Sequence, residues 1–164
     1  MQPVMKNRTP VPWGGILALA GASLTLVALF LPWLGVRLAD FGELFAELDL
    51  GDVTANGLNS GAGILRLILV LGALSLSVVA ILLRTPIVRR GVAIALIPVG
   101  ALLFVLVVIE FVDLAGATLR VGAYLALAAS PMVVIGGILG LAEAKHLEGN
   151  ATGRIPVAPP PPPG

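Results

Sequence analysis

The stretch GAGILRLILVLGALSLSVVAILLRTPIVRRGVAIALIPVGALLFVLVVIEFV, residues 61–112, decides the fold of this chain. It contains two apolar runs, 61–83 and 91–112, which are separated by the basic segment 84–90. A helix needs about 20 predominantly apolar residues to cross the hydrocarbon core of a bilayer. Both runs have that length, so the sequence predicts a hairpin of two membrane-spanning helices.

Two further apolar runs, 13–36 and 121–142, lie on either side of this hairpin. Only 12% of the 164 residues are charged and 58% are hydrophobic, whereas soluble domains carry about 25% charged residues. These values predict an all-α membrane protein, an antiparallel bundle of four transmembrane helices. The expected organisation is a cytoplasmic leader, a transmembrane domain containing one long outer loop, and a disordered Pro-rich cytoplasmic tail: residues 1–12, 13–145 (loop 37–60) and 146–164.

The basic residues predict the orientation of the bundle. Most of them fall on one side of an arrangement with four antiparallel spans: Lys6, Arg8, Arg84, Arg89, Arg90, Lys145 and Arg154. Loops rich in Lys and Arg stay in the cytoplasm, so we expect a multi-pass protein of the plasma (inner) membrane with both termini cytoplasmic. Trp13 and Trp33 bracket the first span and are expected to be interfacial anchors, because Trp is enriched at the membrane–water boundary.

The outer loop carries a helical pattern of its own. Apolar residues recur at intervals of three and four between residues 38 and 48, and acidic residues lie between them: Asp40, Glu43 and Glu47. This spacing predicts a short amphipathic helix, followed by turns in segments 49–52 and 54–61. The acidic residues are interpreted as a docking face for a basic partner. A simply solvated acidic face is one alternative. A divalent-cation site that also includes Asp49 and Asp52 is the other, although the alternating ligand order of an EF-hand is absent.

Arg66 and Glu110 are the most distinctive polar residues, because ionisable side chains within spans are costly and often mark function. Both are placed near the outer ends of their spans, Arg66 about five residues deep and Glu110 about two. An intramembrane ion pair is therefore expected. One hypothesis is a gate or a proton-linked pair; the others are a structural clasp between the second and third spans, or extension of each side chain to the interface.

Small residues recur every four positions in two spans, namely Gly14, Ala18 and Ala22 in the first and Gly136 and Gly140 in the fourth. Such rows let helices approach closely within membranes. They predict helix-packing faces, either within one bundle or between two copies of the chain.

Several classes of function are not expected. The chain has no Cys, one His and a net charge of +1, so thiolate metal sites, Cys nucleophiles and a basic nucleic-acid footprint are ruled out. No P-loop, HExxH or His/Asp/Ser constellation is present. We expect no enzyme activity, no catalytic or metal-binding residues, no cofactor and no nucleic-acid partner.

The segment Leu31-Pro-Trp-Leu34 ends the first span, and Thr54-Ala-Asn-Gly-Leu58 precedes the second. This arrangement resembles small uncharacterised four-span membrane proteins of actinobacteria, over residues 10–145. The resemblance implies topology and no particular activity. The long first outer loop is also loosely similar to that of claudin-like tetraspans, but their loop cysteines are lacking.

The leading hypothesis for function is a non-enzymatic accessory or scaffold subunit that associates with a larger membrane complex. Few central polar residues, rows of small residues, an acidic loop and a Pro-rich tail motivate it. The alternative is a small oligomeric transporter or channel, for which Pro98 and Pro131 would provide helix breaks. The expected partners are the lipid bilayer and either another membrane protein or further copies of this chain.

Overall fold

The structure is a computed structural model, and it describes residues 11–37, 52–59, 61–83, 85–113 and 118–152. Four helices in the described part are long and apolar enough to cross a membrane: α1 (Trp13–Phe30), α3 (Gly63–Leu82), α4 (Pro86–Asp113) and α5 (Val121–Thr152). The candidate span within α5 covers Val121–Leu147. The prediction of four helices of spanning length is confirmed.

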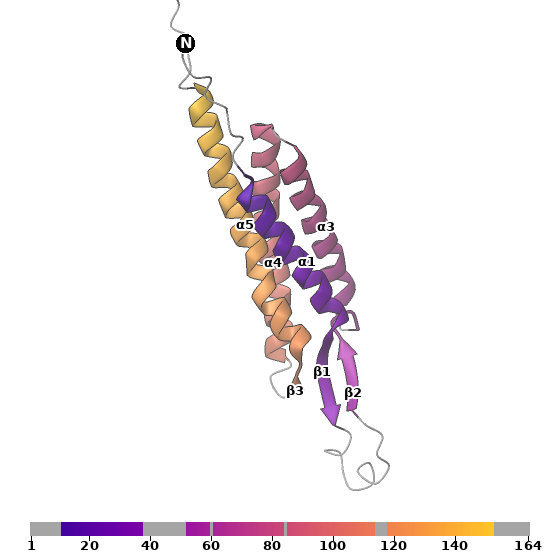
Figure 1. Cartoon of the computed structure of the whole chain (residues 1–164). Helices are drawn as coiled ribbons and strands as arrows, with labels where there is room; N and C mark the ends of the chain where they lie inside the picture. Colours follow the sequence, from indigo (N-terminus) through magenta and orange to yellow (C-terminus); the bar gives the residue numbers. More distant parts are fainter. Residues whose placement is uncertain (1–10, 38–51, 60, 84, 114–117, 153–164) are drawn as a thin grey trace, which may run out of the picture.

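The helices form an elongated bundle in which chain neighbours run in opposite directions (Figure 1). α5 packs against α1 and α4, and α3 packs against the same two helices from the other side. Each helix therefore contacts antiparallel neighbours, as in an up-down bundle with short connections.

The helix boundaries correct several predicted ranges. α1 ends at Phe30 instead of continuing to residue 36. Leu31 is extended, with ψ of 157°, because the residue before a proline is driven out of the helical region. α4 starts at Pro86 and includes most of the predicted basic loop, since proline is favoured in the first turn of a helix. α5 continues to Thr152, so residues 146–152 are helical and not part of a disordered tail.

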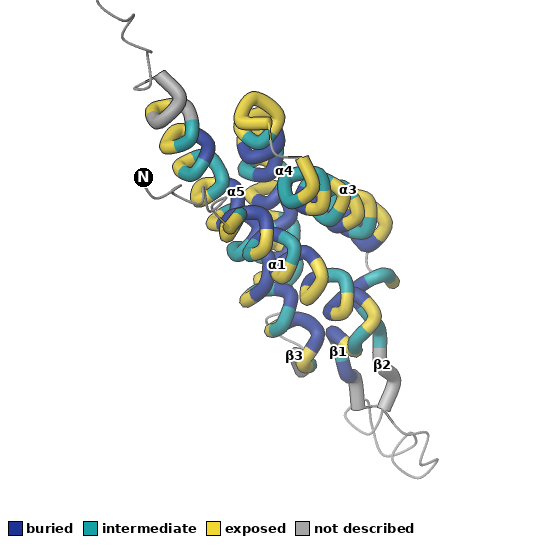
Figure 2. Tube along the Cα trace, turned by 45° about the horizontal axis from the view of Figure 1, so that its top comes forward, coloured by how far each residue is buried: buried dark blue, intermediate teal, exposed yellow. Residues whose placement is uncertain are grey.

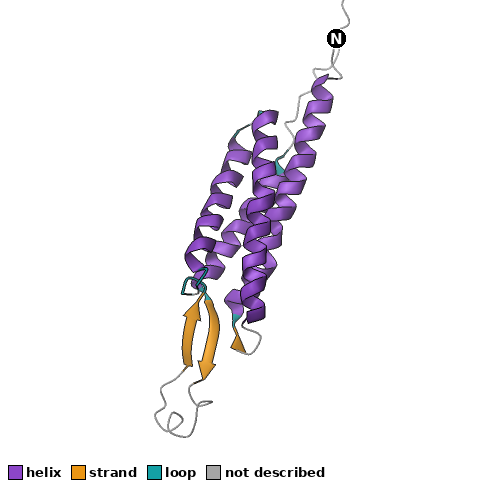
Figure 3. Cartoon of the chain, turned by 180° about the vertical axis from the view of Figure 1, so that it is seen from behind, coloured by secondary structure: helices purple, strands orange, loops and turns teal. Residues whose placement is uncertain are grey.

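The expectation of an all-α fold is wrong at one end of the bundle, where three strands form a small sheet. They are β1 (Pro32–Arg37), β2 (Asp52–Asn56) and β3 (Thr118–Leu119), in the order β2-β1-β3 (Figure 3). β1 is central and pairs antiparallel with both neighbours. β2 occupies part of the region predicted as turns, because its hydrogen bonds are made with a strand far away in sequence. The predicted amphipathic helix, and Asp40, Glu43 and Glu47 with it, lie outside the described residues.

Two apolar clusters fill the bundle. The cluster nearer the sheet includes Leu29, Trp33, Val70 and Leu103, and the second includes Leu96 and Val133 with several alanines. The outward-facing positions of the helices are exposed and largely apolar (Figure 2), as expected for surfaces in contact with lipid.

Candidate functional site

Trp33 of β1 lies at the junction between the sheet and the bundle. Its side chain is 2% exposed, and its indole Nε1 donates a hydrogen bond of 2.7 Å to the carbonyl oxygen of Ala28 at the end of α1. The Trp33 carbonyl accepts a hydrogen bond from the Arg120 amide just before α5. The expectation that Trp33 is an interfacial anchor is therefore wrong, because the proline turn directs it into the protein. Trp13 is 65% exposed at the start of α1, and its role as an interfacial anchor stays a prediction.

Arg66 and Glu110 form an ion pair between α3 and α4. Arg66 is fully buried and Glu110 is 15% exposed, so Arg66 does not extend to the interface. The guanidinium carbon of Arg66 also lies 4.6 Å from the centre of the Trp33 ring, which is within the range of a cation–π interaction. The three side chains connect the central strand to two helices and are called the Trp33–Arg66–Glu110 cluster below.

Two glycines make room for the indole ring. A Cβ on Gly57, directly after β2, would lie 2.6 Å from Trp33 Cε2. A Cβ on Gly122, in the first turn of α5, would lie 2.6 Å from Trp33 Cδ1. Sequence reasoning missed Trp33, Gly57 and Gly122 as members of the site. The one available signal was Arg66, a charge within a span that needs partners, but the sequence does not reveal that an indole supplies one.

The cluster predicts the result of a minimal change at Gly57. In Gly57→Ala the new methyl group pushes the indole ring, and we expect destabilisation by about 1–3 kcal/mol with Trp33 more exposed. The measurement is the emission maximum of Trp33 in a Trp13→Phe background, which is selective because the chain has two tryptophans. We expect a shift to longer wavelength. Gly61→Ala is the matched control, since no atom lies within 4 Å of the added carbon. An equal spectrum for both variants would contradict this packing.

The predicted small-residue rows meet within the bundle. A Cβ on Gly14 would lie 2.3 Å from the Gly140 amide nitrogen, and one on Gly136 would lie 2.6 Å from the Ala18 amide nitrogen. Ala18 and Ala22 are fully buried. These residues therefore form a close backbone contact between α1 and α5 within one bundle.

Small polar side chains inside the described bundle are mostly bonded to their own helix. The hydroxyls of Thr25 and Ser77 donate to the carbonyl oxygens of Gly21 and Ala73, at 2.8 and 2.7 Å. The buried hydroxyl of Ser130 has no hydrogen-bond partner among the described residues.

Removing the buried hydroxyl of Ser130 is expected to stabilise the protein, or to leave its stability unchanged. A buried polar group without a partner costs free energy, so Ser130→Ala is expected to leave stability unchanged or raise it by about 1 kcal/mol. Unfolding in mixed micelles measures this, with Ser77→Ala as the hydrogen-bonded comparison. A loss larger than that of Ser77→Ala would show that the Ser130 hydroxyl has a partner.

These features define the class of protein, a multi-pass membrane protein with a sheet fixed to one end of a helical bundle. No family model, curated protein or solved structure matches the chain.

Proposed function

We propose that this protein is a non-enzymatic accessory or scaffold subunit that presents its sheet to a partner membrane protein. The observation that carries the proposal is the Trp33–Arg66–Glu110 cluster, because it fixes the central strand of the sheet to two helices. A sheet fixed in this way is oriented for binding without further ordering, and preorganisation lowers the cost of association.

The sheet also offers a means of contact. β2 and β3 are its edge strands, and the edge of a sheet carries backbone groups that can pair with a strand of another chain. The acidic outer loop and the Pro-rich tail supply further candidate contacts by composition.

We place the sheet outside the cell and both termini in the cytoplasm. Arg89, Arg90 and Lys145 are on α4 and α5 near the end opposite the sheet, and such residues favour the cytoplasmic side. The chain has no native cysteine, so single Asn59→Cys and His146→Cys variants report sidedness directly. An impermeant thiol reagent applied to intact cells should label the first and spare the second; the reverse pattern would contradict the orientation.

The test of function is native mass spectrometry after extraction in the mildest effective detergent. We expect a stoichiometric, larger membrane protein to accompany the chain. Trp33→Ala should release that partner, whereas Gly72→Ala, at a position with nothing within 4 Å of the added carbon, should retain it. A lone monomer would contradict the proposal.

A transporter or channel is the second candidate, and it requires assembly because the core of a single bundle is closely packed and mostly apolar in the described residues. A homo-oligomer without another partner would favour it. Flux through liposomes that is unchanged by Arg66→Ala and Glu110→Gln would then exclude the ion pair as its gate.

A further inference from the structure

Exposed aromatic side chains occur only near helix ends in the described part of the bundle. Three aromatic residues are strongly exposed there, namely Trp13 at 65%, Phe30 at 60% and Tyr124 at 55%. Trp13 begins α1 and Phe30 ends it, and Tyr124 lies in the first turn of α5. Exposed aliphatic side chains occur along all four helices, so only the aromatic residues distinguish one level of the bundle from another.

Phe30 and Tyr124 lie at a similar level, at the end of the bundle that carries the sheet. A Cβ on Gly122 would lie 2.9 Å from the Pro32 carbonyl oxygen, so α5 meets the chain after α1 at this point. Phe30 is two residues before Pro32, and Tyr124 is two residues after Gly122. Because α1 and α5 run antiparallel (Figure 1), both steps lead from the contact toward the middle of the bundle.

Phe111, in the last turn of α4, joins these two residues. Its ring packs edge-on against the ring of Tyr124, with centroids 5.7 Å apart and an interplanar angle of 74°, which is a favoured geometry for aromatic pairs. Phe111 itself packs against the apolar cluster nearer the sheet. The hydroxyl of Tyr124 makes no hydrogen bond to the described residues. Phe30, Phe111 and Tyr124 are called the sheet-end aromatic group below.

The place of each residue within its helix agrees with its polarity. Side chains in a helix tilt toward the N-terminus of that helix. Tyr124 is in the first turn of α5, so its hydroxyl is directed toward the sheet. Phe30 and Phe111 are in the last turns of α1 and α4, so these two wholly apolar rings tilt back toward the middle of the bundle.

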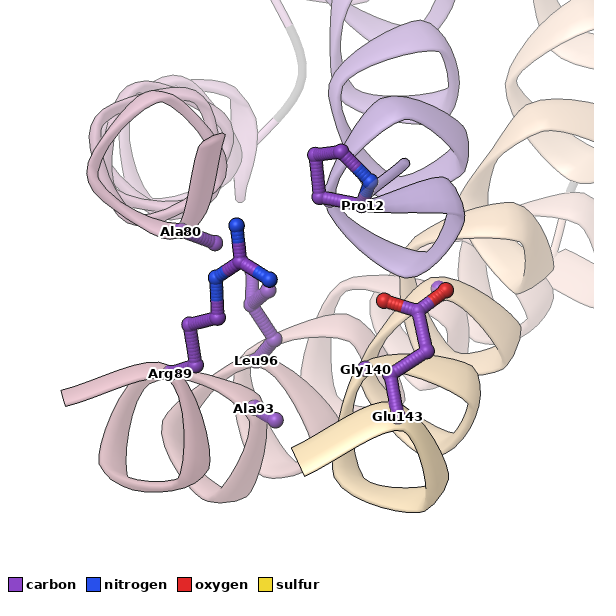
Figure 4. Close-up of a pocket in the computed structure, with 9 residues that line it drawn as sticks. Pro12, Ala80, Arg89, Ala93, Leu96, Gly140 and Glu143 are labelled. Atoms are coloured by element: carbon purple, nitrogen blue, oxygen red, sulfur yellow. The ribbon is translucent and has the colours of Figure 1, made fainter. Parts of the chain in front are cut away.

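Charged side chains mark the opposite end of the bundle, at the level of Trp13. Gly14 lies against Gly140, and its amide donates a hydrogen bond of 3.0 Å to Oε1 of Glu143. Figure 4 shows Glu143 and Arg89 around a recess at this level, which has room for about one water molecule. The polar surroundings of the bundle therefore begin near Trp13.

The separation of the two levels matches the thickness of a bilayer. Gly140 lies sixteen residues after Tyr124 in α5, a rise of about 24 Å at 1.5 Å per residue. Trp13 and Tyr124 are both in the first turns of their helices, so both side chains tilt outward from this span. The distance between the aromatic levels is thus comparable with the roughly 30 Å of a hydrocarbon core.

We propose that the sheet-end aromatic group inserts into the interfacial layer of the phospholipids and sets the depth of the protein in the bilayer. Tyr is enriched at this layer because its ring is apolar and its hydroxyl is polar. Strand β1 begins two residues after Phe30, so the sheet is held at the membrane surface. The Arg66–Glu110 ion pair, next to Phe111 in sequence, lies at the edge of the hydrocarbon.

The experiment is electron paramagnetic resonance of the full chain in phosphatidylcholine vesicles, with a nitroxide label on a single introduced cysteine, because the chain has none. Val121→Cys and Ala128→Cys place labels at exposed positions of α5 on either side of Tyr124. We expect the label at 121 to be accessible to a water-soluble nickel chelate, and the label at 128 to be accessible to oxygen and shielded from nickel.

Adding Tyr124→Leu should lower the nickel accessibility at position 121, because leucine lacks the polar hydroxyl and favours the hydrocarbon. Tyr124→Phe should lower it less, since the ring remains. Ile135→Leu is the matched control: Ile135 is 48% exposed on the same helix, farther from the sheet, and its replacement should leave both labels unchanged. Circular dichroism checks that each variant keeps its helices.

Equal nickel accessibility of the two labels would overturn the proposal, because the interfacial layer would then not pass Tyr124. An effect of Tyr124→Leu no larger than that of Ile135→Leu would also overturn it. The measurement uses no partner protein, so its outcome is independent of the proposed accessory function.

Discussion

Arg66→Met is expected to lower the free energy of unfolding by about 3–5 kcal/mol, because it leaves a largely buried carboxylate without its cation. Glu110 is 15% exposed and pairs with Arg66, so water can reach it only in part. The same change removes the cation from the face of Trp33. The loss should be visible in unfolding titrations in mixed micelles, together with a change in Trp33 emission.

The double variant Arg66→Met/Glu110→Leu isolates the role of charge. Replacing both members of a buried ion pair by apolar residues is often neutral or stabilising, so we expect the double variant to regain most of the lost stability. Asp113→Asn, at an exposed carboxylate near the end of α4, is the control and should have little effect. The single variant Glu110→Leu completes the comparison. If the double variant lost as much stability as Arg66→Met and Glu110→Leu lose in sum, the ion pair would not be coupled in the folded protein.

Gly136→Ala is expected to have the second large effect, a loss of about 3 kcal/mol, because one methyl group would separate two helices. The added carbon would lie 2.6 Å from the Ala18 amide nitrogen and 2.7 Å from the Gly14 carbonyl oxygen. Both are backbone atoms, so no side chain can rotate away, and α1 must move relative to α5.

Gly72→Ala is the matched control for Gly136→Ala. It makes the same change in the interior of α3, where nothing lies within 4 Å of the new carbon. Because alanine is favoured over glycine in helices by about 1 kcal/mol, Gly72→Ala should maintain or raise stability. Equal effects of the two variants on the unfolding midpoint would argue against the close contact of α1 with α5.

The candidate site was only partly predictable. Arg66 and Glu110 stood out because charges are rare within apolar runs, and their depths were consistent with a pair. The spacing between Trp13 and Trp33 predicts a position for Trp33 at the interface. Nothing local shows that β1 turns its indole toward Arg66, because this depends on strand pairing between segments distant in sequence.

The sequence by itself determined four spanning-length helices and their small-residue faces, because hydrophobic length and four-residue spacing are local properties of the chain. The tertiary structure decided three things. The chain after Leu31 forms strand β1, the glycines of α1 and α5 contact each other, and Arg66 is paired with Glu110 beside Trp33. These depend on contacts between residues far apart, such as Gly14 with Gly140 and Trp33 with Arg66. A local pattern cannot encode such contacts, because the same apolar helix face can pack equally well against lipid, another helix or another chain.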